Sequence, residues 1–127
     1  MKAARILIVD DEESICLAVK DYLEHGGHRV DCARSLEDAE PLLVPGRYAV
    51  VIADLRLSAS EPSGGLRLLR RVRESSPQTR TVLLTAYGSP EAEAEARRLG
   101  VDALLAKAEG LQEVASVVRG LLAPAQA

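Results

Sequence analysis

The sequence is poor in aromatic side chains. Among its 127 residues there is no Phe and no Trp, and Tyr22, Tyr48 and Tyr87 are the only tyrosines. The core must therefore be aliphatic, and one compact domain can be built that way because 47% of the chain is hydrophobic. Functions that stack bases, flavins or sugars on aromatic rings are disfavoured.

Cysteines and long apolar runs are also scarce. Cys16 and Cys32 are the only cysteines and no signal peptide is recognisable, so we expect reduced thiols, a role as small core residues and a cytoplasmic location. No apolar run approaches the roughly 20 residues of a membrane span, so we expect a soluble protein without a membrane partner.

The charge pattern gives no broad positive face. The formal net charge is −3, and the clustered arginines at positions 67, 70, 71 and 73 fit the solvated face of one predicted helix. We therefore expect no direct binding of nucleic acid. A dinucleotide-binding role is also excluded, because no Gly-x-Gly-x-x-Gly motif follows the first apolar run.

Short apolar runs alternate five times with segments of helical period, which predicts an α/β fold with a parallel sheet covered on both faces. The predicted strands are 5–9, 29–33, 49–53, 81–84 and 103–106. The predicted helices are 13–24, 36–43, 65–74, 90–99 and 111–122. We expect one domain over residues 1–122 and a tail or linker over 123–127. Pro41 should make the second helix the least regular element.

Polar residues stand where four of these apolar runs end: Asp10 with Asp11, Asp54, Thr85 and Lys107. The carboxyl ends of parallel strands share one edge of a sheet, where ligands bind. Each residue alone has a plainer interpretation, as a helix cap, a turn, a strand residue or a surface charge. Lysine occurs only three times in the chain, however, so its place at a strand end is selective.

Together these residues can receive a phosphoryl group. Three gathered carboxylates repel one another unless a cation lies between them, and oxygen ligands suit Mg²⁺. Asp54 could then act as a nucleophile toward phosphorus and form an aspartyl phosphate. Lys107 and the Thr85 hydroxyl could contact other phosphoryl oxygens, and a contact with Thr85 would bias the fourth helix, fifth strand and fifth helix.

The chain resembles the receiver domain of two-component response regulators over nearly its whole length. The resemblance rests on Ile8-Val9-Asp10-Asp11-Glu12, Val51-Ile52-Ala53-Asp54-Leu55, Leu84-Thr85-Ala86-Tyr87-Gly88 and Ala106-Lys107. It implies a doubly wound, flavodoxin-like (βα)5 domain with strand order 2-1-3-4-5. The segment 84–88 is most similar to receivers attached to transcriptional regulators.

The resemblance also assigns roles. It implies Asp54 as phosphoacceptor, Asp10, Asp11, Asp54 and the carbonyl of Arg56 as Mg²⁺ ligands, Thr85 as switch hydroxyl and Lys107 as phosphate partner. Its implied partners are a sensor histidine kinase or a phosphotransfer protein, with a possible homodimer through the fourth helix, fifth strand and fifth helix. Such a domain assists its own phosphorylation and dephosphorylation and is not otherwise an enzyme.

Three features depart from the family pattern. Ala108 follows Lys107 where the family usually has a cis proline, so we expect a trans bond there. Leu104 stands where the family usually has an aromatic switch residue. The loop 57–63 is two or three residues longer than is typical, and we expect it to flank the site. Tyr87 and Arg56 occupy positions that tune the phosphoryl lifetime, although both could simply be solvated loop residues.

Two other functions stay open on the sequence alone. Leu104 and Ala108 allow a degenerate receiver that acts as an interaction or dimerisation module without phosphorylation. A Mg²⁺-dependent phosphohydrolase is less favoured, because such enzymes commonly need an acid where Arg56 stands. The chain can be a stand-alone receiver or part of a longer regulator.

Overall fold

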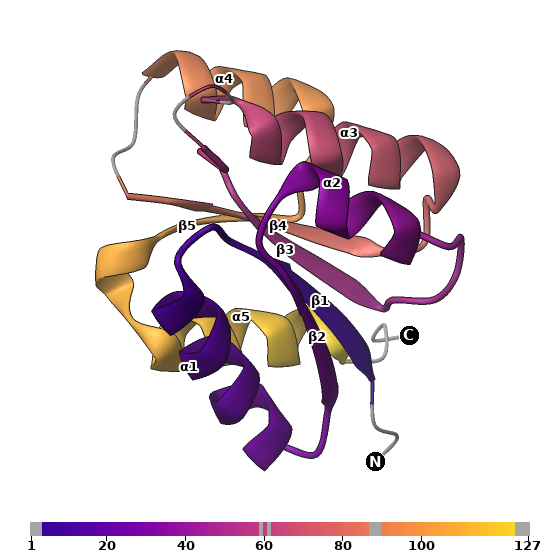
Figure 1. The fold of residues 1–127 in the computed structure, drawn as a ribbon, viewed down its shortest axis with the longest axis vertical. Coiled ribbons are helices and arrows are strands. Elements are labelled where there is room, and N and C mark those ends of the chain that lie inside the picture. Colours follow the sequence, from indigo (N-terminus) through magenta and orange to yellow (C-terminus); the bar gives the residue numbers. More distant parts are fainter. Residues whose placement is uncertain (1–3, 59, 61, 87–89, 124–127) are drawn as a thin grey trace.

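The computed structural model describes residues 4–58, 60, 62–86 and 90–123. Within them, strands and helices alternate along the chain (Figure 1). The strands are β1 Arg5–Val9, β2 Arg29–Ala33, β3 Val50–Asp54, β4 Arg80–Thr85 and β5 Ala103–Ala106. The α-helices are α1 Glu13–His25, α2 Leu36–Ala39, α3 Gly64–Ser75, α4 Pro90–Leu99 and α5 Leu111–Leu122. Two 3₁₀ turns, η1 Glu40–Leu42 and η2 Lys107–Glu109, follow α2 and β5.

The five strands form one parallel sheet in the order β2-β1-β3-β4-β5. Helices α1 and α5 cover one face of the sheet, and α2, α3 and α4 cover the other (Figure 1). This is the doubly wound, flavodoxin-like fold that the sequence predicts. The strand order reverses between β1 and β3, so the ends of these two strands border the crevice where such folds bind ligands.

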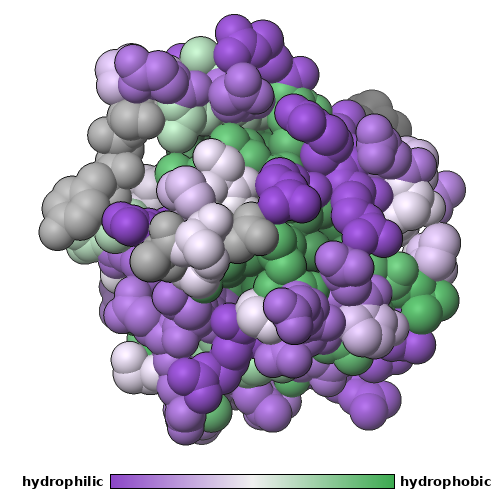
Figure 2. All heavy atoms as spheres, turned by 45° about the horizontal axis from the view of Figure 1, so that its top comes forward, coloured by the Kyte–Doolittle hydropathy of each residue, from purple (hydrophilic) through white to green (hydrophobic). Residues whose placement is uncertain are grey.

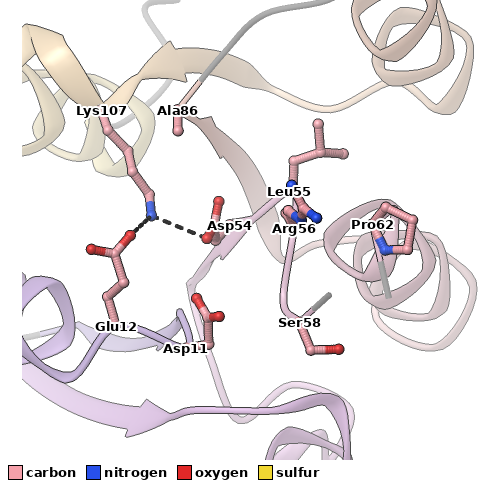
Figure 3. Close-up of a pocket in the computed structure, with 9 residues that line it drawn as sticks. All are labelled: Asp11, Glu12, Asp54, Leu55, Arg56, Ser58, Pro62, Ala86 and Lys107. Carbon is pink, nitrogen blue, oxygen red and sulfur yellow. Dashed lines mark hydrogen bonds and ion pairs between the residues drawn. The ribbon is translucent and has the colours of Figure 1, made fainter. Parts of the chain in front are cut away.

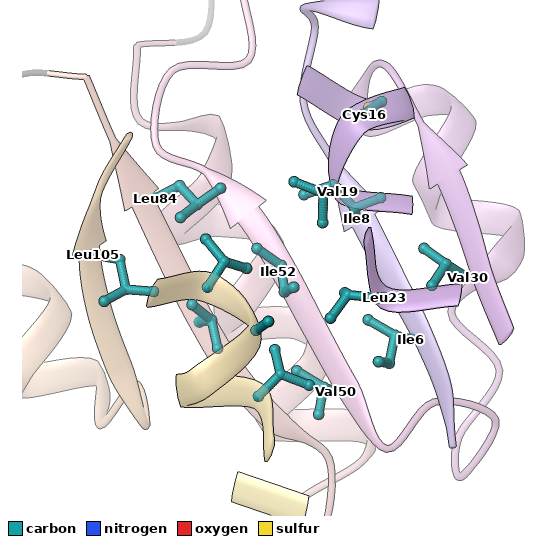
Figure 4. Packing of buried hydrophobic residues seen from close by; sticks show 14 residues of the cluster. Ile6, Ile8, Cys16, Val19, Leu23, Val30, Val50, Ile52, Leu84 and Leu105 are labelled. Carbon is teal, nitrogen blue, oxygen red and sulfur yellow. The ribbon is translucent and has the colours of Figure 1, made fainter. Parts of the chain in front are cut away.

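The middle residues of the central strands are mostly aliphatic because helices cover both faces of the sheet. Ile6, Ile8 and Ile52 point into the core under α1 and α5, as Figure 4 shows. Leu7 and Val9, which alternate with the β1 isoleucines, point into the core under α3. All four β1 residues from Ile6 to Val9 are fully buried. Side chains at a strand end are therefore held on a rigid frame.

The second helix is the least regular element, as Pro41 predicts. Ser35 caps it by accepting a hydrogen bond from the Asp38 amide at 3.0 Å. After one turn the α-helix gives way to η1, whose first turn contains Pro41. The predicted helix 36–43 is therefore an α-turn followed by a 3₁₀ turn.

The two strands that carry site residues end later than predicted. β3 spans Val50–Asp54 and not 49–53, and β4 spans Arg80–Thr85 and not 81–84. The reason is continued parallel pairing, which matches Asp54 with Leu84 and Thr85 with Ala106. Asp54 and Thr85 are thus the last residues of their strands, and the sheet itself fixes their backbones.

The surface that Figure 2 shows is mostly hydrophilic, with hydrophobic residues in smaller patches. Among the described residues, the large hydrophobic side chains that are exposed are Leu17, Tyr22 and Val44. No helix in the described part of the chain has both the length and the apolar character required to cross a membrane. The expected tail at 123–127 lies outside the described residues except for Ala123.

Gly65 permits α3 to start directly against the end of β3. Its amide donates to the Leu55 carbonyl at 2.9 Å. A Cβ atom at this position would overlap the Asp54 carbonyl and lie 2.9 Å from Leu55 Cα. Both neighbours are backbone atoms, so a side chain here would displace the segment that carries Asp54.

We predict that Gly65→Ala lowers the free energy of unfolding by roughly 1–3 kcal/mol, because the backbone must shift. Gly120→Ala is the matched control, since a Cβ at Gly120 in α5 meets no atom within 4 Å. That variant should gain about 0.5–1 kcal/mol from its reduced flexibility. Urea unfolding of both variants measures the difference, and equal stability of the two would contradict the close approach at Gly65.

Candidate phosphoacceptor and metal site

Several of the predicted site residues line one cavity at the carboxyl edge of the sheet. Asp10 follows β1, Asp54 ends the neighbouring strand β3, and Lys107 follows β5. The cavity has a volume of about 460 Å³ (Figure 3). Its lining residues are Asp11, Glu12, Asp54, Leu55, Arg56, Ser58, Pro62, Ala86 and Lys107. The parallel topology therefore assembles acids and an ammonium from distant parts of the chain.

Lys107 is the centre of the charged contacts. Its Nζ lies 3.0 Å from Asp10 Oδ2, 3.0 Å from Glu12 Oε1 and 3.0 Å from Asp54 Oδ2. The contacts with Glu12 and Asp54 are hydrogen bonds, drawn in Figure 3. The Lys107 side chain is only 14% exposed, so these pairs are weakly screened by solvent. One ammonium thus faces more carboxylates than it can neutralise.

The two oxygens of Asp10 have different roles. Oδ1 accepts a hydrogen bond from the Glu12 amide at 2.9 Å, at the start of α1. Because α1 begins at Glu13 and Glu12 is its N-cap residue, this bond closes a turn before the helix, and the helix-capping interpretation of Asp10 is not confirmed. Oδ2 is buried, and no donor in the described residues is aligned for a hydrogen bond with it, although Lys107 pairs with it by charge. Asp10 Oδ2 therefore retains acceptor capacity beside the ammonium of Lys107.

Burial disfavours the ionised forms of these acids. The pKa of Asp54 is raised to about 6, because burial and the negative charges of Asp10 and Asp11 together outweigh the hydrogen bond and charge of Lys107, which lower it. Burial also raises the pKa of Asp10. For Lys107, burial lowers the pKa, but the close contacts with the carboxylates of Glu12, Asp10 and Asp54 outweigh it and raise the pKa overall. The site carries an excess of negative charge that a bound cation would relieve.

The donor set suits a divalent cation. Asp10, Asp11 and Glu12 each offer a carboxylate oxygen, and these oxygens lie within 4.8 Å of one another. The buried Asp10 Oδ2 offers an acceptor without an aligned donor. All of these ligand atoms are hard oxygens, the type that Mg²⁺ and Ca²⁺ prefer. The residues present therefore fit the metal that the acidic cluster predicts.

The remaining predicted residues differ in whether they line the cavity. Arg56 lines it. Thr85 ends β4 at the same edge and is 5% exposed, but it is not one of the lining residues. Leu104 packs on the α3 and α4 face of the sheet. Tyr87 lies outside the described residues.

The longer loop after β3 forms one wall of the cavity. Leu57 is 3% exposed and packs into the core under α3, which anchors the start of the loop. Ser58 and Pro62 line the cavity, and positions 59 and 61 lie outside the described residues. The sequence correctly places this loop beside the site.

Glu12 is a site residue to which the sequence alone gives no role. Its side chain makes no cap hydrogen bond at the start of α1 and is bound to Lys107 instead. The available signal was a third acid after β1 together with a rare lysine after β5.

The peptide bonds of the described residues include no cis bond, which agrees with a trans bond before Ala108.

A sequence model of the family described as "Response regulator receiver domain" matches residues 6–119. The transcriptional regulatory protein PmrA of Pectobacterium parmentieri is 32% identical over 118 residues, which are 93% of this chain and 52% of PmrA. The chain therefore belongs to the receiver domain family of two-component response regulators. It spans about half the length of this curated relative.

Solved receiver structures share the fold. The non-phosphorylated HemR receiver domain from Leptospira biflexa superposes with a TM-score of 0.86 at 25% identity, over 98% of both chains. A response regulator from Burkholderia pseudomallei, solved with a phosphorylated aspartic acid, a calcium ion and citrate, gives a TM-score of 0.78 at 26% identity. That match covers 92% of this chain and 71% of the other.

We predict that Asp54 makes stability fall as the pH rises. Its folded pKa of about 6 exceeds the ordinary value of 3.8, so the unfolded chain ionises first and stability is lost between about pH 4 and pH 6. Asp54→Asn should remove this loss and exceed the wild type by ~1–3 kcal/mol above about pH 7, with no advantage near pH 4. Urea unfolding across this range with a metal chelator tests it, and an advantage that does not change with pH would contradict it.

Proposed function

We propose that this chain is a phosphoacceptor receiver in which Asp54 takes a phosphoryl group from the phosphohistidine of a sensor kinase or phosphotransfer protein. The observation that carries this proposal is the ammonium of Lys107, held 3.0 Å from Asp54 Oδ2 in a cavity lined by carboxylates. The cavity joins a nucleophile, a fixed positive charge and hard oxygen ligands. Phosphoryl transfer needs these three components together.

In the transfer step, an Asp54 carboxylate oxygen attacks phosphorus while the bond from phosphorus to the histidine nitrogen breaks, and the imidazole leaves. With a pKa of about 6, Asp54 is mostly ionised at neutral pH and is able to attack. Lys107 already contacts the attacking carboxylate, and its ammonium can then pair with the negatively charged phosphoryl oxygens. Bound Mg²⁺, held by Asp10, Asp11, Asp54 and the Arg56 carbonyl, would neutralise charge on the transferring oxygens.

The signal would leave the site through β4 and β5. Thr85 ends β4 beside Ala106, the residue before Lys107, so the proposed switch hydroxyl and phosphate partner are on paired strands. A phosphate contact to Thr85 would shift the equilibrium between inactive and active conformations of the surface formed by α4, β5 and α5. A homodimer could form through this surface. Leu104 replaces the usual aromatic residue, so switching here proceeds without aromatic gating.

Two side chains would set how long the phosphoryl group lasts. Arg56 lines the cavity, where its bulk can hinder water from reaching the acyl phosphate. Tyr87 lies two positions after Thr85 in the sequence, as Arg56 lies two positions after Asp54. Catalysis by the domain would be confined to its own phosphorylation and dephosphorylation.

The relatives suggest the context of the domain. PmrA is a transcriptional regulatory protein, and it is about twice as long as the matched segment. The Burkholderia structure carries a phosphorylated aspartic acid and a divalent ion. By analogy, we propose that residues 1–122 act as the receiver part of a cytoplasmic regulator of similar organisation.

Incubation with acetyl phosphate and Mg²⁺ tests the proposal. The mass of the intact protein should rise by one phosphoryl group, and the gain should be lost with Asp54→Asn or with a chelator. No gain in the folded wild type would contradict the proposal and favour a receiver that serves as an interaction module without phosphorylation. Continuous turnover of small phosphate esters would favour a phosphohydrolase.

Glu12 should slow phosphorylation by small anionic donors, because it adds negative charge to the cavity and holds Lys107. At saturating Mg²⁺ and low salt, Glu12→Gln should be phosphorylated a few-fold faster, equivalent to ~1 kcal/mol or less, and salt should reduce the difference. Glu13→Gln is the matched control, since Glu13 is adjacent but pairs with Arg34 at 3.0 Å. Equal acceleration by both variants would attribute the effect to net charge and contradict a specific role of Glu12.

A further inference from the structure

The two cysteines of the chain lie against each other on one face of the sheet. Cys16 belongs to α1 and Cys32 to the edge strand β2, and both pack in the core under α1 and α5, where Figure 4 labels Cys16. The Cys32 thiol donates to the Cys16 carbonyl at 3.5 Å. The fold therefore brings together two thiols that are 16 positions apart in the sequence.

The two thiols differ in their access to solvent. Cys16 is 2% exposed, whereas Cys32 is only partly buried. A small reagent would therefore reach Cys32 first and find Cys16 behind it. This is the arrangement of an accessible thiol backed by a second thiol that resolves its oxidised form.

The surroundings also favour the reactive form of Cys32. The neighbouring Cys16 side chain lowers the pKa of the Cys32 thiol, burial opposes this change, and the nearby charge of Lys20 also lowers the pKa. The thiolate is the form that attacks oxidants. Charge and geometry therefore favour the same residue as the first to react.

We propose that Cys16 and Cys32 form an oxidation site at which hydrogen peroxide converts the two thiols into a disulfide. The Cys32 thiolate attacks one peroxide oxygen, the O–O bond breaks, and Cys32 becomes a sulfenic acid while hydroxide leaves. Cys16 then attacks that sulfur, the S–O bond breaks, and the leaving hydroxide takes up the Cys16 proton as water. Two thiols lose two electrons and one peroxide becomes two waters.

The disulfide would alter the surroundings of Asp10. In the reduced protein the Cys16 thiol donates to the Asp10 carbonyl at 3.2 Å and lies 3.8 Å from the Ala33 carbonyl. Neither sulfur of a disulfide carries a hydrogen, so the Asp10 carbonyl loses this donor. The oxidation site itself does not depend on phosphorylation of Asp54.

The test uses the reduced wild-type chain, titrated with hydrogen peroxide, with free thiols then alkylated. We expect the intact monomer to lose the mass of two hydrogens and to resist alkylation at both cysteines, and peptide mapping should join Cys16 to Cys32. The same titration in concentrated urea should form this bond more slowly. The proposal would be overturned if both thiols could still be alkylated after peroxide treatment, or if disulfides formed only between molecules. It would also be overturned if the disulfide formed at the same rate with and without urea.

Single variants test the order of reaction. In Cys16→Ser, peroxide should stop at a sulfenic acid on Cys32 that a cyclic 1,3-dione traps. In Cys32→Ser, Cys16 should stay alkylatable after unfolding, because it is buried. Trapping of a sulfenic acid on Cys16 in a folded Cys32→Ser protein would contradict the proposed order of reaction. If either variant fails to fold, as seen by circular dichroism, the wild-type map still decides.

Discussion

The site depends on one buried positive charge among several negative ones. Lys107 Nζ is within 3.0 Å of carboxylate oxygens from Asp10, Glu12 and Asp54, and its side chain is only 14% exposed. Without Lys107 the buried carboxylates of Asp10 and Asp54 would lack this neutralising charge, which would cost free energy. Even with it, burial still raises the pKa of Asp54 to about 6. The protein therefore holds a strained charge balance that a divalent cation and a phosphoryl group could complete.

The backbone keeps this charge balance in place. β1 and β3 are neighbours in the sheet, and residues 6–9 of β1 and all residues of β3 are almost completely inaccessible to solvent, so the carboxyl ends of these strands can move little. Gly65 lets α3 start against the Asp54 carbonyl, and Asp10 fixes the start of α1 through the Glu12 amide. The residues that make the fold rigid are thus directly beside those that carry charge. Precise placement of charged groups is what phosphoryl transfer requires.

Much of the fold could be predicted because its pattern is local. Apolar runs of four to six residues specify buried parallel strands, and Ser35 and Pro41 specify the cap and the irregularity of the second helix. The positions of Asp54 and Lys107 at strand ends predicted that they would meet. The side-chain partners could not be predicted, because they depend on rotamers and depth. Glu12 is an example, since its sequence position fits a helix cap equally well while its carboxylate is bound to Lys107.

A crystal structure of the protein with Mg²⁺ and beryllofluoride would test the central claim most directly. The account predicts a beryllofluoride group on an Asp54 carboxylate oxygen, a metal ion that shares Asp54 with Asp10 and Asp11, and Lys107 Nζ in contact with a fluorine atom. An Asp54 carboxylate without an adduct and still paired with Lys107 at saturating ligand, or a metal bound only by Asp10, Asp11 and Glu12, would contradict it.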